Sequence, residues 1–178
     1  MSADDVELVQ RCRAGDRAAF DVLVLRYQLP VYNAALRMLG NREDAKDVAQ
    51  NAFLKAFEHL EDFDPQYRFF SWLYRIALNE ALTALGRRKQ YAEITGSEID
   101  GAPGPEATTA GGQTAVAINV ALLRLVSEQR QVVILRHVLD LSYEEMAEVL
   151  QVPDKTVKSR LHSARQKLRE LLIHERTR

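Results

Sequence analysis

The segment from Ser142 to Arg169 constrains this chain most, because it predicts two short helices that meet at a tight turn. Ser142 and Glu145 form the S-x-x-E pattern of a capping box, which marks the start of a helix. Pro153 follows that helix, since proline has no N–H to donate and disfavours a helical conformation in the residue before it. Asp154 can then cap the next helix with a carboxylate near its positive end. The pattern predicts a helix-turn-helix, a unit that reads double-stranded DNA.

The second helix of this unit has an apolar face and a cationic face. Val157, Leu161 and Ala164 recur at helical spacing and are expected to face the core. From Lys155 to Arg178, eight basic residues stand against two acidic ones, a local charge of +6. Such a face suits the phosphates and base edges of a major groove, and the alternative is an amphipathic helix whose charges only keep it soluble. The outward positions are Lys155, Lys158, Ser159, His162, Ser163 and Gln166, with Arg165 and Arg169 on the flank.

Composition limits the remaining possibilities. The chain has 178 residues, of which 47% are hydrophobic, so it can bury one or two small cores, and no apolar run approaches the length of a membrane span. The acidic start of the chain lacks the features of a secretory signal, which predicts a cytoplasmic protein. The net charge is only −1, so nucleic-acid binding must be argued from the distribution of charge. Cys12 is the single cysteine; we expect a packing residue, and a redox sensor is the alternative.

A change of composition divides the chain. Residues 90–113 contain five glycines, two prolines and four acidic residues but no Lys or Arg, which predicts a flexible acidic linker. Extended, such a linker could span roughly 80 Å. The sequence shows no strand pattern and no internal repeat. We therefore expect an all-α protein with two small helical domains, residues 1–89 and 114–178.

The first domain contains several helix signals. A helix is expected from Asp16 to Gly40, within which Pro30 predicts a bend or a break. Asn41 is expected to cap the next helix. Residues 60–70 read as a loop, and the helix after it is expected to end at Gly86 and the three cations that follow.

The last helix of that domain carries a candidate surface for unpaired bases. Trp72, Arg75, Asn79 and Thr83 lie at positions i, i+3, i+7 and i+11 and so share one face. Aromatic rings stack on bases, and amides and cations bond their exposed edges. The alternative is that the aromatic residues simply fill a small core. Nearby cations favour the nucleic-acid interpretation; they are Arg68, Arg87, Arg88 and Lys89.

Together these motifs resemble one family. The segments DVAQNAF (47–53), WLYRIALN (72–79) and TVKSRL (156–161), in this order and at these distances, are similar to those of an extracytoplasmic-function (group four) sigma factor of bacterial RNA polymerase. The resemblance covers nearly the whole chain. It implies that the first domain is sigma region two, which binds the β′ clamp helices of core polymerase and recognises and melts the minus-ten element. It implies that the second domain is sigma region four, which reads the minus-thirty-five element and touches the β flap.

The resemblance also implies roles for individual residues. Asp47 and Gln50 correspond to contacts with core polymerase. The minus-ten candidates, from the base-capturing loop and the helix after it, are Phe63, Arg68, Phe70, Trp72, Arg75, Asn79, Arg87 and Arg88. The minus-thirty-five candidates are Lys155, Thr156, Lys158, Ser159, Arg160, His162, Ser163 and Arg165.

The expected function is promoter-specific transcription initiation without covalent chemistry, in a stress or envelope response under the control of an anti-sigma factor. No enzymatic activity, cofactor or metal is expected, because the four histidines form no metal-ligand spacing with Cys12 and no phosphate loop or nucleophile arrangement is present. The linker is expected to lie in a polymerase channel, and an inert spacer is the alternative. A second hypothesis is an autonomous helix-turn-helix repressor, which would bind duplex DNA tightly without polymerase.

Overall fold

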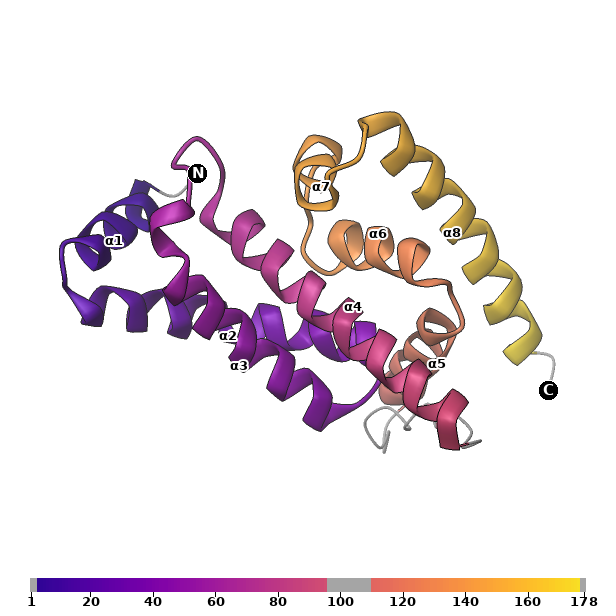
Figure 1. Ribbon diagram of the computed structural model, residues 1–178. Coiled ribbons are helices and arrows are strands. Elements are labelled where there is room, and N and C mark those ends of the chain that lie inside the picture. Colours follow the sequence, from indigo (N-terminus) through magenta and orange to yellow (C-terminus); the bar gives the residue numbers. More distant parts are fainter. Residues whose placement is uncertain (1–2, 96–109, 177–178) are drawn as a thin grey trace.

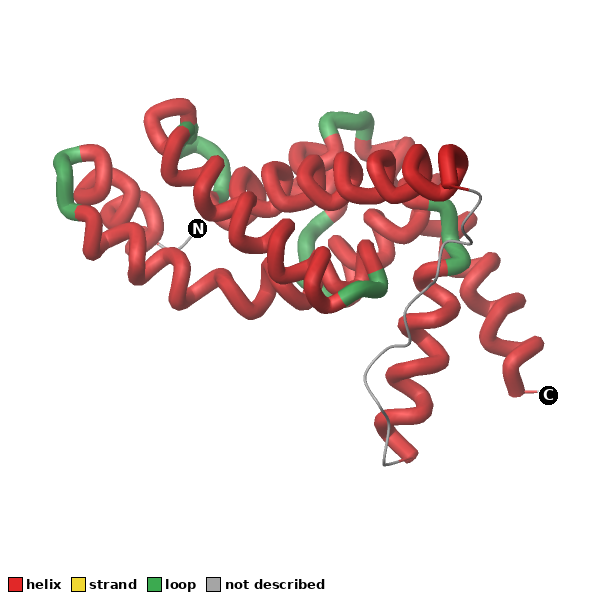
Figure 2. The backbone as a smooth tube through the Cα atoms, turned by 60° about the horizontal axis from the view of Figure 1, so that its bottom comes forward, coloured by secondary structure: helices red, strands yellow, loops and turns green. Residues whose placement is uncertain are grey.

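A computed structural model of the chain describes residues 3–95 and 110–176, and these residues form helices joined by short loops, with no strand among them (Figure 2). Figure 1 shows their arrangement along the chain. We call α1 to α4 with η1 the N-terminal half and α5 to α8 the C-terminal half. The elements are α1 (Ala3–Arg13), α2 (Arg17–Leu39), α3 (Arg42–Glu58), the 3-10 turn η1 (Leu60–Asp62), α4 (Phe69–Thr95), α5 (Ala110–Leu123), α6 (Ser127–His137), α7 (Tyr143–Leu150) and α8 (Asp154–Arg176).

Local signals place the junction between α2 and α3. Gly40 adopts a left-handed conformation with φ 71°, which glycine reaches without strain, and its N–H bonds the carbonyl of Leu36. The side chain of Asn41 then accepts hydrogen bonds from the backbone N–H groups of Glu43 (2.9 Å) and Asp44 (3.0 Å). Both the end of α2 and the cap of α3 are confirmed as the sequence predicts.

Pro30 does not break α2, which is helical from Arg17 to Leu39 with the proline inside it. Proline removes one backbone hydrogen bond and clashes with the preceding turn, at a cost of about 3 kcal/mol. Leu23, Val31 and Ala34 flank it and are fully buried. Burial of several apolar side chains on both sides of Pro30 offsets that cost, at about 1.5–3 kcal/mol for each large one.

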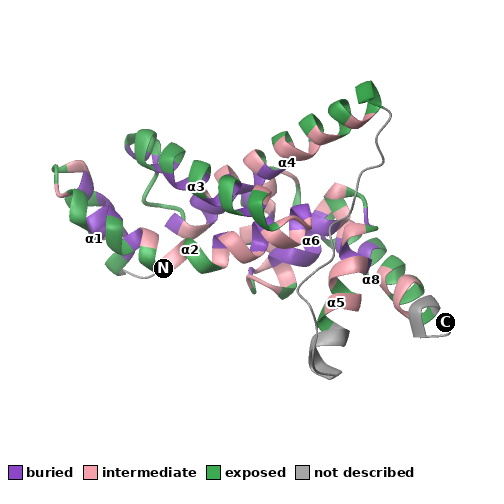
Figure 3. Cartoon of the chain, turned by 90° about the horizontal axis from the view of Figure 1, so that it is seen from below, coloured by how far each residue is buried: buried purple, intermediate pink, exposed green. Residues whose placement is uncertain are grey.

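The end of α4 differs from the prediction, because the helix passes through Gly86 and ends at Thr95. The positive-φ glycines in the described residues are Gly15 and Gly40, so Gly86 keeps a helical conformation and cannot act as a left-handed cap. Residues 90–95 therefore belong to α4 and residues 110–113 to α5. The expected linker between them, 96–109, lies outside the described residues. The last turns of α4 project beyond the core and are mostly exposed (Figure 3).

The helix-turn-helix lies at α7 and α8. The capping box is present, since Ser142 N donates to Glu145 Oε2 (2.8 Å) and Glu145 N donates to Ser142 Oγ (3.2 Å). Gln151 makes the turn with φ 52°. Asp154 is the first residue of α8, and its carboxylate pairs with Lys158 Nζ (2.6 Å) instead of capping a backbone N–H. The predicted inward residues are buried, with Val157, Leu161 and Ala164 each at most 1% exposed.

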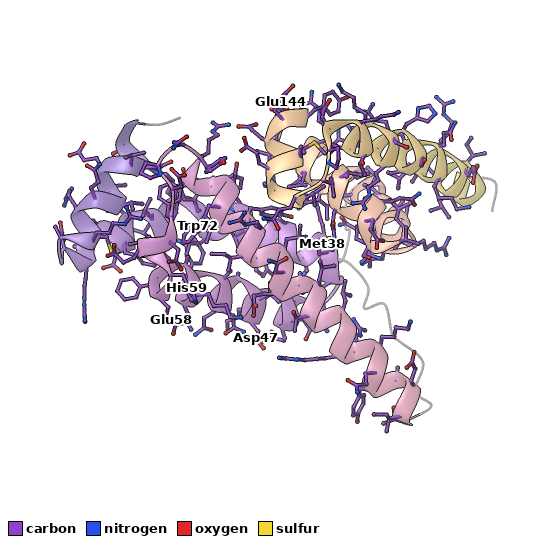
Figure 4. The ribbon with its side chains drawn as sticks, turned by 45° about the horizontal axis from the view of Figure 1, so that its top comes forward. Met38, Asp47, Glu58, His59, Trp72 and Glu144 are labelled. Carbon is purple, nitrogen blue, oxygen red and sulfur yellow. The ribbon has the colours of Figure 1, made fainter. Side chains whose placement is uncertain are left out.

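The two halves share a core. One cluster of buried side chains joins Met38 of α2 and Leu78 of α4 to Leu122 of α5 and Leu135 of α6. A second cluster lies inside the N-terminal half, around Leu23, Phe53, Phe69 and Leu73. Figure 4 shows Met38 where α2 meets the C-terminal half. The structure therefore presents two helical units packed against each other.

Candidate nucleic-acid and partner interfaces

The α8 surface is the candidate reader of duplex DNA. Lys155, Lys158, Ser159, His162, Ser163 and Arg165 are exposed, whereas Thr156 and Arg160 are partly buried. The inner face of α8 packs on α5, α6 and α7, so the cationic face points away from the core. The structure thus brings the minus-thirty-five candidates together on one face, with Thr156 and Arg160 at its edge.

Two of these cations are held by neighbouring side chains. Lys158 pairs with Asp154 and lies 5.4 Å from the centre of the Tyr143 ring. The hydrogen bond to Asp154 raises the pKa of Lys158, so this ammonium stays charged. Arg165 Nη2 lies 3.3 Å from His137 Nε2. Burial, and then the nearby Arg165 and Arg136, lower the pKa of His137, which favours a neutral imidazole that can accept from Arg165.

The candidate surface for unpaired bases lies at the start of α4 and in the loop before it. Phe63 is 2% exposed and packs against Phe69 and Trp72, with ring centres 5.5 Å away in each case. Phe70 is partly buried between Tyr27 and Tyr74. In this arrangement Phe63 is therefore a core residue, as the alternative interpretation of the aromatic side chains expects. Trp72 and Arg75 remain partly exposed, and Asn79 is exposed.

Trp72 and Arg75 line a pocket of about 300 Å³ that both halves build. We call it the interdomain pocket. The hydroxyl of Ser71 lines it, is buried and has no hydrogen-bond partner among the described atoms. From the N-terminal half the lining residues are Asp62, Phe63, Asp64, Tyr67, Ser71, Trp72 and Arg75, and from α7 and its turn they are Glu148, Val149 and Gln151.

Arg13 positions the loop at this pocket, a role that sequence reasoning missed. Its guanidinium donates to the carbonyls of Leu60 (2.8 Å), Glu61 (2.9 Å) and Phe63 (2.6 Å). The three carbonyls belong to η1 and to the residue after it, and the Leu60 carbonyl also accepts from the N–H of Phe63 (3.2 Å). A charged donor from α1 thus fixes the loop that would capture a base. No local sequence pattern reveals this, because Arg13 and the loop are about 50 residues apart.

Asp47 and Gln50 are both exposed on α3 but line different grooves. Gln50 lines an apolar groove of about 910 Å³ between α2 and α3, where Leu29 and Leu54 are 63% and 55% exposed. Asp47 lines a polar groove of about 540 Å³ between α3 and α4, together with Arg87 and Arg88. Figure 4 shows Asp47 on α3, away from Trp72 near the start of α4. The two candidate contacts for core polymerase therefore lie in different grooves.

The described residues give little support for a reactive Cys12 or for a metal site. Cys12 is buried in the core of the N-terminal half, and burial, followed by the charges of Asp16, Asp21 and Glu61, raises the pKa of its thiol. The thiolate is the reactive form, so the packing interpretation of Cys12 is favoured. Within residues 3–95 and 110–176, no group of three or more His, Cys, Asp or Glu side chains could hold a metal ion. No helix there is long and apolar enough to cross a membrane.

An all-helical fold that combines a helix-turn-helix with an aromatic, cationic helix surface defines a class of DNA-binding proteins. Residues 23–91 match the Sigma-70 region 2 family, and residues 115–168 match the Sigma-70 region 4 family. The chain is 35% identical over 180 residues to the RNA polymerase sigma-H factor of Pseudomonas aeruginosa, covering 94% of this chain and 93% of that protein. It is 34% identical over 177 residues to the ECF RNA polymerase sigma factor SigW of Bacillus subtilis, covering 92% and 94%. The chain therefore belongs to the extracytoplasmic-function sigma factors of the sigma-70 family.

Two solved structures share its architecture. CnrH in complex with the cytosolic domain of CnrY is 29% identical, with a TM-score of 0.74, and the match covers 96% of this chain and 98% of that one. The sigma factor RpoE in complex with the anti-sigma factor NepR, from Bartonella quintana, is 25% identical, with a TM-score of 0.77 and coverage of 86% and 96%. Family membership and these matches confirm the predicted all-α fold and the family resemblance. Sigma factors are not enzymes, which agrees with the prediction.

Proposed function

We propose that this chain binds core RNA polymerase and directs it to specific promoters, with the N-terminal half acting on the minus-ten element and the C-terminal half on the minus-thirty-five element. The observation that carries the proposal is that both sigma-70 regions match the chain in order and that relatives named as sigma factors align over more than nine-tenths of it. An RNA polymerase subunit acts in the cytoplasm, which we propose as its location. Control by an anti-sigma factor is supported by the structural relative solved with NepR.

The mechanism is a shift of equilibrium by differential binding. Unstacking a base costs a few kcal/mol, and stacking it on an aromatic ring returns about 1–3 kcal/mol. A single captured base is therefore marginal. Trp72 and Arg75 supply a ring and a cation beside the base-capturing loop, and the α8 face supplies duplex contacts. Stable opening then requires both surfaces on one polymerase.

In vitro transcription with purified core polymerase tests the proposal. A library of genomic promoter fragments should yield RNA from defined start sites only when this chain is added. Absence of start-site selection on every template would refute the proposal. Tight duplex binding without polymerase, together with blocked transcription by another sigma factor, would favour the repressor hypothesis instead.

The contact with core polymerase can be mapped on α3. We propose that both Asp47 and Gln50 contribute, through the polar and the apolar groove respectively. Separate Asp47→Ala and Gln50→Ala variants should each weaken the affinity for labelled core polymerase. Glu58→Ala, an exposed change at the far end of α3, is the matched control. If only one variant binds core polymerase more weakly, the contact lies in the groove of that residue. If both variants bind as tightly as the parent chain, neither residue has the proposed role.

A further inference from the structure

Helix α1 lies before residues 23–91, the part of the chain that matches Sigma-70 region 2, so family membership gives this helix no role. Its inner side packs in the core of the N-terminal half, where Leu8 and Val9 are at most 5% exposed. Two polar side chains, Asp5 and Arg13, also turn inward from this helix, with 6% of Asp5 and 23% of the Arg13 side chain exposed. Buried polar groups nearly always have a partner, and the partners of both residues lead to one loop.

Arg13, the last residue of α1, holds the beginning of the base-capturing loop, residues 60–70. Its guanidinium donates to three carbonyls, those of Leu60, Glu61 and Phe63. The ring of Phe63 in turn packs against Trp72, with the ring centres 5.5 Å apart. One charged side chain of α1 is therefore connected through the loop to the ring that is proposed to stack on an unpaired base.

Asp5, near the start of α1, holds the other end of the loop through Tyr27. One oxygen of its carboxylate accepts from the Tyr27 hydroxyl (2.5 Å), and the other accepts from Arg26. The Tyr27 ring lies 5.2 Å from the ring of Phe70 and 6.0 Å from that of Phe69, measured between ring centres. These two phenylalanines are the first residues of α4, so Asp5 fixes the ring against which the loop ends.

The two connections meet at Trp72. The ring of Phe69 lies 5.7 Å from that of Trp72, on the same helix as Phe70, and the ring of Phe63 also contacts it. Asp5 and Arg13 are eight residues apart on one helix, which is a separation of roughly 12 Å along its axis. A single rigid element thus holds both ends of the loop.

We propose that α1 is a positioning element for base capture, in which Arg13 and Asp5 hold the two ends of the loop so that Trp72 and Phe70 are in place before unpaired promoter DNA arrives. This inference rests on the proposed function, because it concerns the same minus-ten surface. A loop that is already ordered binds with a smaller loss of conformational entropy. Ordering the backbone of one residue changes an equilibrium about five- to thirtyfold, so releasing one end of the loop should slow base capture by about that factor.

Arg13→Met releases the beginning of the loop, because methionine keeps the apolar stem and removes every donor. Arg11→Met is the matched control, since Arg11 lies on the same helix but pairs with Asp16 (2.6 Å) instead of the loop. Arg13→Lys keeps a cationic donor and should recover part of the loss. Circular dichroism of the full-length variants checks that each one remains folded.

Asp5→Ala releases the other end of the loop. Asp4→Ala is the matched control, because Asp4 pairs with the same Arg26 but has no contact with the Tyr27 hydroxyl. Tyr27→Phe removes only the hydroxyl that donates to Asp5, and it takes the place of Asp5→Ala if circular dichroism shows that variant to be unfolded.

Fluorescence of Trp72 measures the order of the loop directly, because it is the single tryptophan of the chain. Acrylamide should quench Trp72 more strongly in Arg13→Met and in Asp5→Ala than in the parent chain, whereas both controls should match the parent. If either variant is quenched only as much as its control, α1 does not hold that end of the loop and the inference is overturned.

The kinetics of promoter opening test the functional part of the inference. Holoenzyme is formed from core polymerase and each full-length variant, and the rate of open-complex formation is followed against holoenzyme concentration on the strongest promoter of the library. The maximal rate should fall about five- to thirtyfold in Arg13→Met and in Asp5→Ala. The half-saturating concentration should not change, because the α8 face and the grooves of α3 are not altered.

A general loss of structure would give a different result. It would change the half-saturating concentration together with the maximal rate, and that outcome, or an equal loss of rate in the controls, would overturn the inference. If the parent chain directs no transcription from any promoter, the proposed function is refuted. Quenching of Trp72 then still shows whether α1 holds the loop, so the two failures can be distinguished.

Discussion

Replacing Arg130 by methionine should destabilise the whole chain, because this side chain joins the C-terminal ends of two helices. Its guanidinium donates to the carbonyls of Leu122 (2.9 Å), Leu123 (2.6 Å) and Leu125 (2.9 Å), and also to that of Met38 at the end of α2. Arg130 is 8% exposed, and its burial lowers the pKa of the guanidinium. Arg130→Met keeps most of the volume and removes every donor.

The expected loss follows from those four carbonyls. A hydrogen bond to a backbone carbonyl contributes about 1 kcal/mol net, so four contribute about 4 kcal/mol. Methionine places additional apolar atoms in the same buried volume, which returns about 1 kcal/mol. The net loss should therefore be about 3 kcal/mol. This is a large part of the 5–15 kcal/mol that typically separates folded from unfolded states.

Urea unfolding of the full chain measures this loss. With a slope of about 2 kcal/mol per molar, the midpoint should fall by roughly 1.5 M. Arg169→Met, an exposed arginine of α8, should change stability by less than about 0.5 kcal/mol. Hydrogen exchange of the Gly40 N–H should also quicken, since Arg130 supports the last turn of α2 from the other half. A loss below about 1 kcal/mol, or equal losses in both variants, would refute the reasoning.

Asn41→Ala should cost about 1 kcal/mol in urea unfolding, because two N–H groups at the start of α3 lose their acceptor; an unchanged midpoint would contradict the cap. Lys158→Ala should reduce the salt dependence of duplex binding by about 0.9 in log–log slope, and an unchanged slope would remove Lys158 from the phosphate contacts. Burial raises the pKa of the Cys12 thiol and so disfavours the reactive thiolate, and hydrogen peroxide should therefore not alter the binding of single-stranded DNA. If peroxide inhibits this binding in the parent chain but not in Cys12→Ala, Cys12 has a redox role. Burial alone would raise the pKa of Glu145, but hydrogen bonds from the Ser142 backbone and Arg68 outweigh it and the pKa lies below the ordinary 4.5. The stability that Glu145 contributes is therefore present above about pH 4.5 and is lost as the pH falls through the lowered pKa of this carboxyl in the folded chain. The urea midpoints of the parent chain and Glu145→Gln should therefore converge in acid.

Several local elements could be predicted from the sequence because their determinants lie within a few residues of one another. The capping box of Ser142 and Glu145 spans one turn, and so does the cap at Asn41. The inward face of α8 follows from helical periodicity alone. These interactions are short-range, so the residue types and their spacing are sufficient to place them.

Tertiary packing decided the features that local rules got wrong. Pro30 and Gly86 both signal helix ends, yet each lies inside a helix. For Pro30, burial on both sides outweighs the local penalty. The burial of Phe63, and the different grooves that Asp47 and Gln50 line, also depend on which helices lie alongside. A glycine or proline inside a helix costs about 1–3 kcal/mol, and the burial of a few large apolar side chains contributes more than that.

The sequence by itself determined where α2, α3, α7 and α8 begin and which face of α8 is cationic. Only the tertiary structure decided that Arg130 reaches Met38 across 92 residues and that Arg68 reaches Glu145 across 77. The physical reason is that periodicity and caps report the environment of a residue along its own helix, whereas a contact between helices also depends on the path of the chain and on a core shared by both halves.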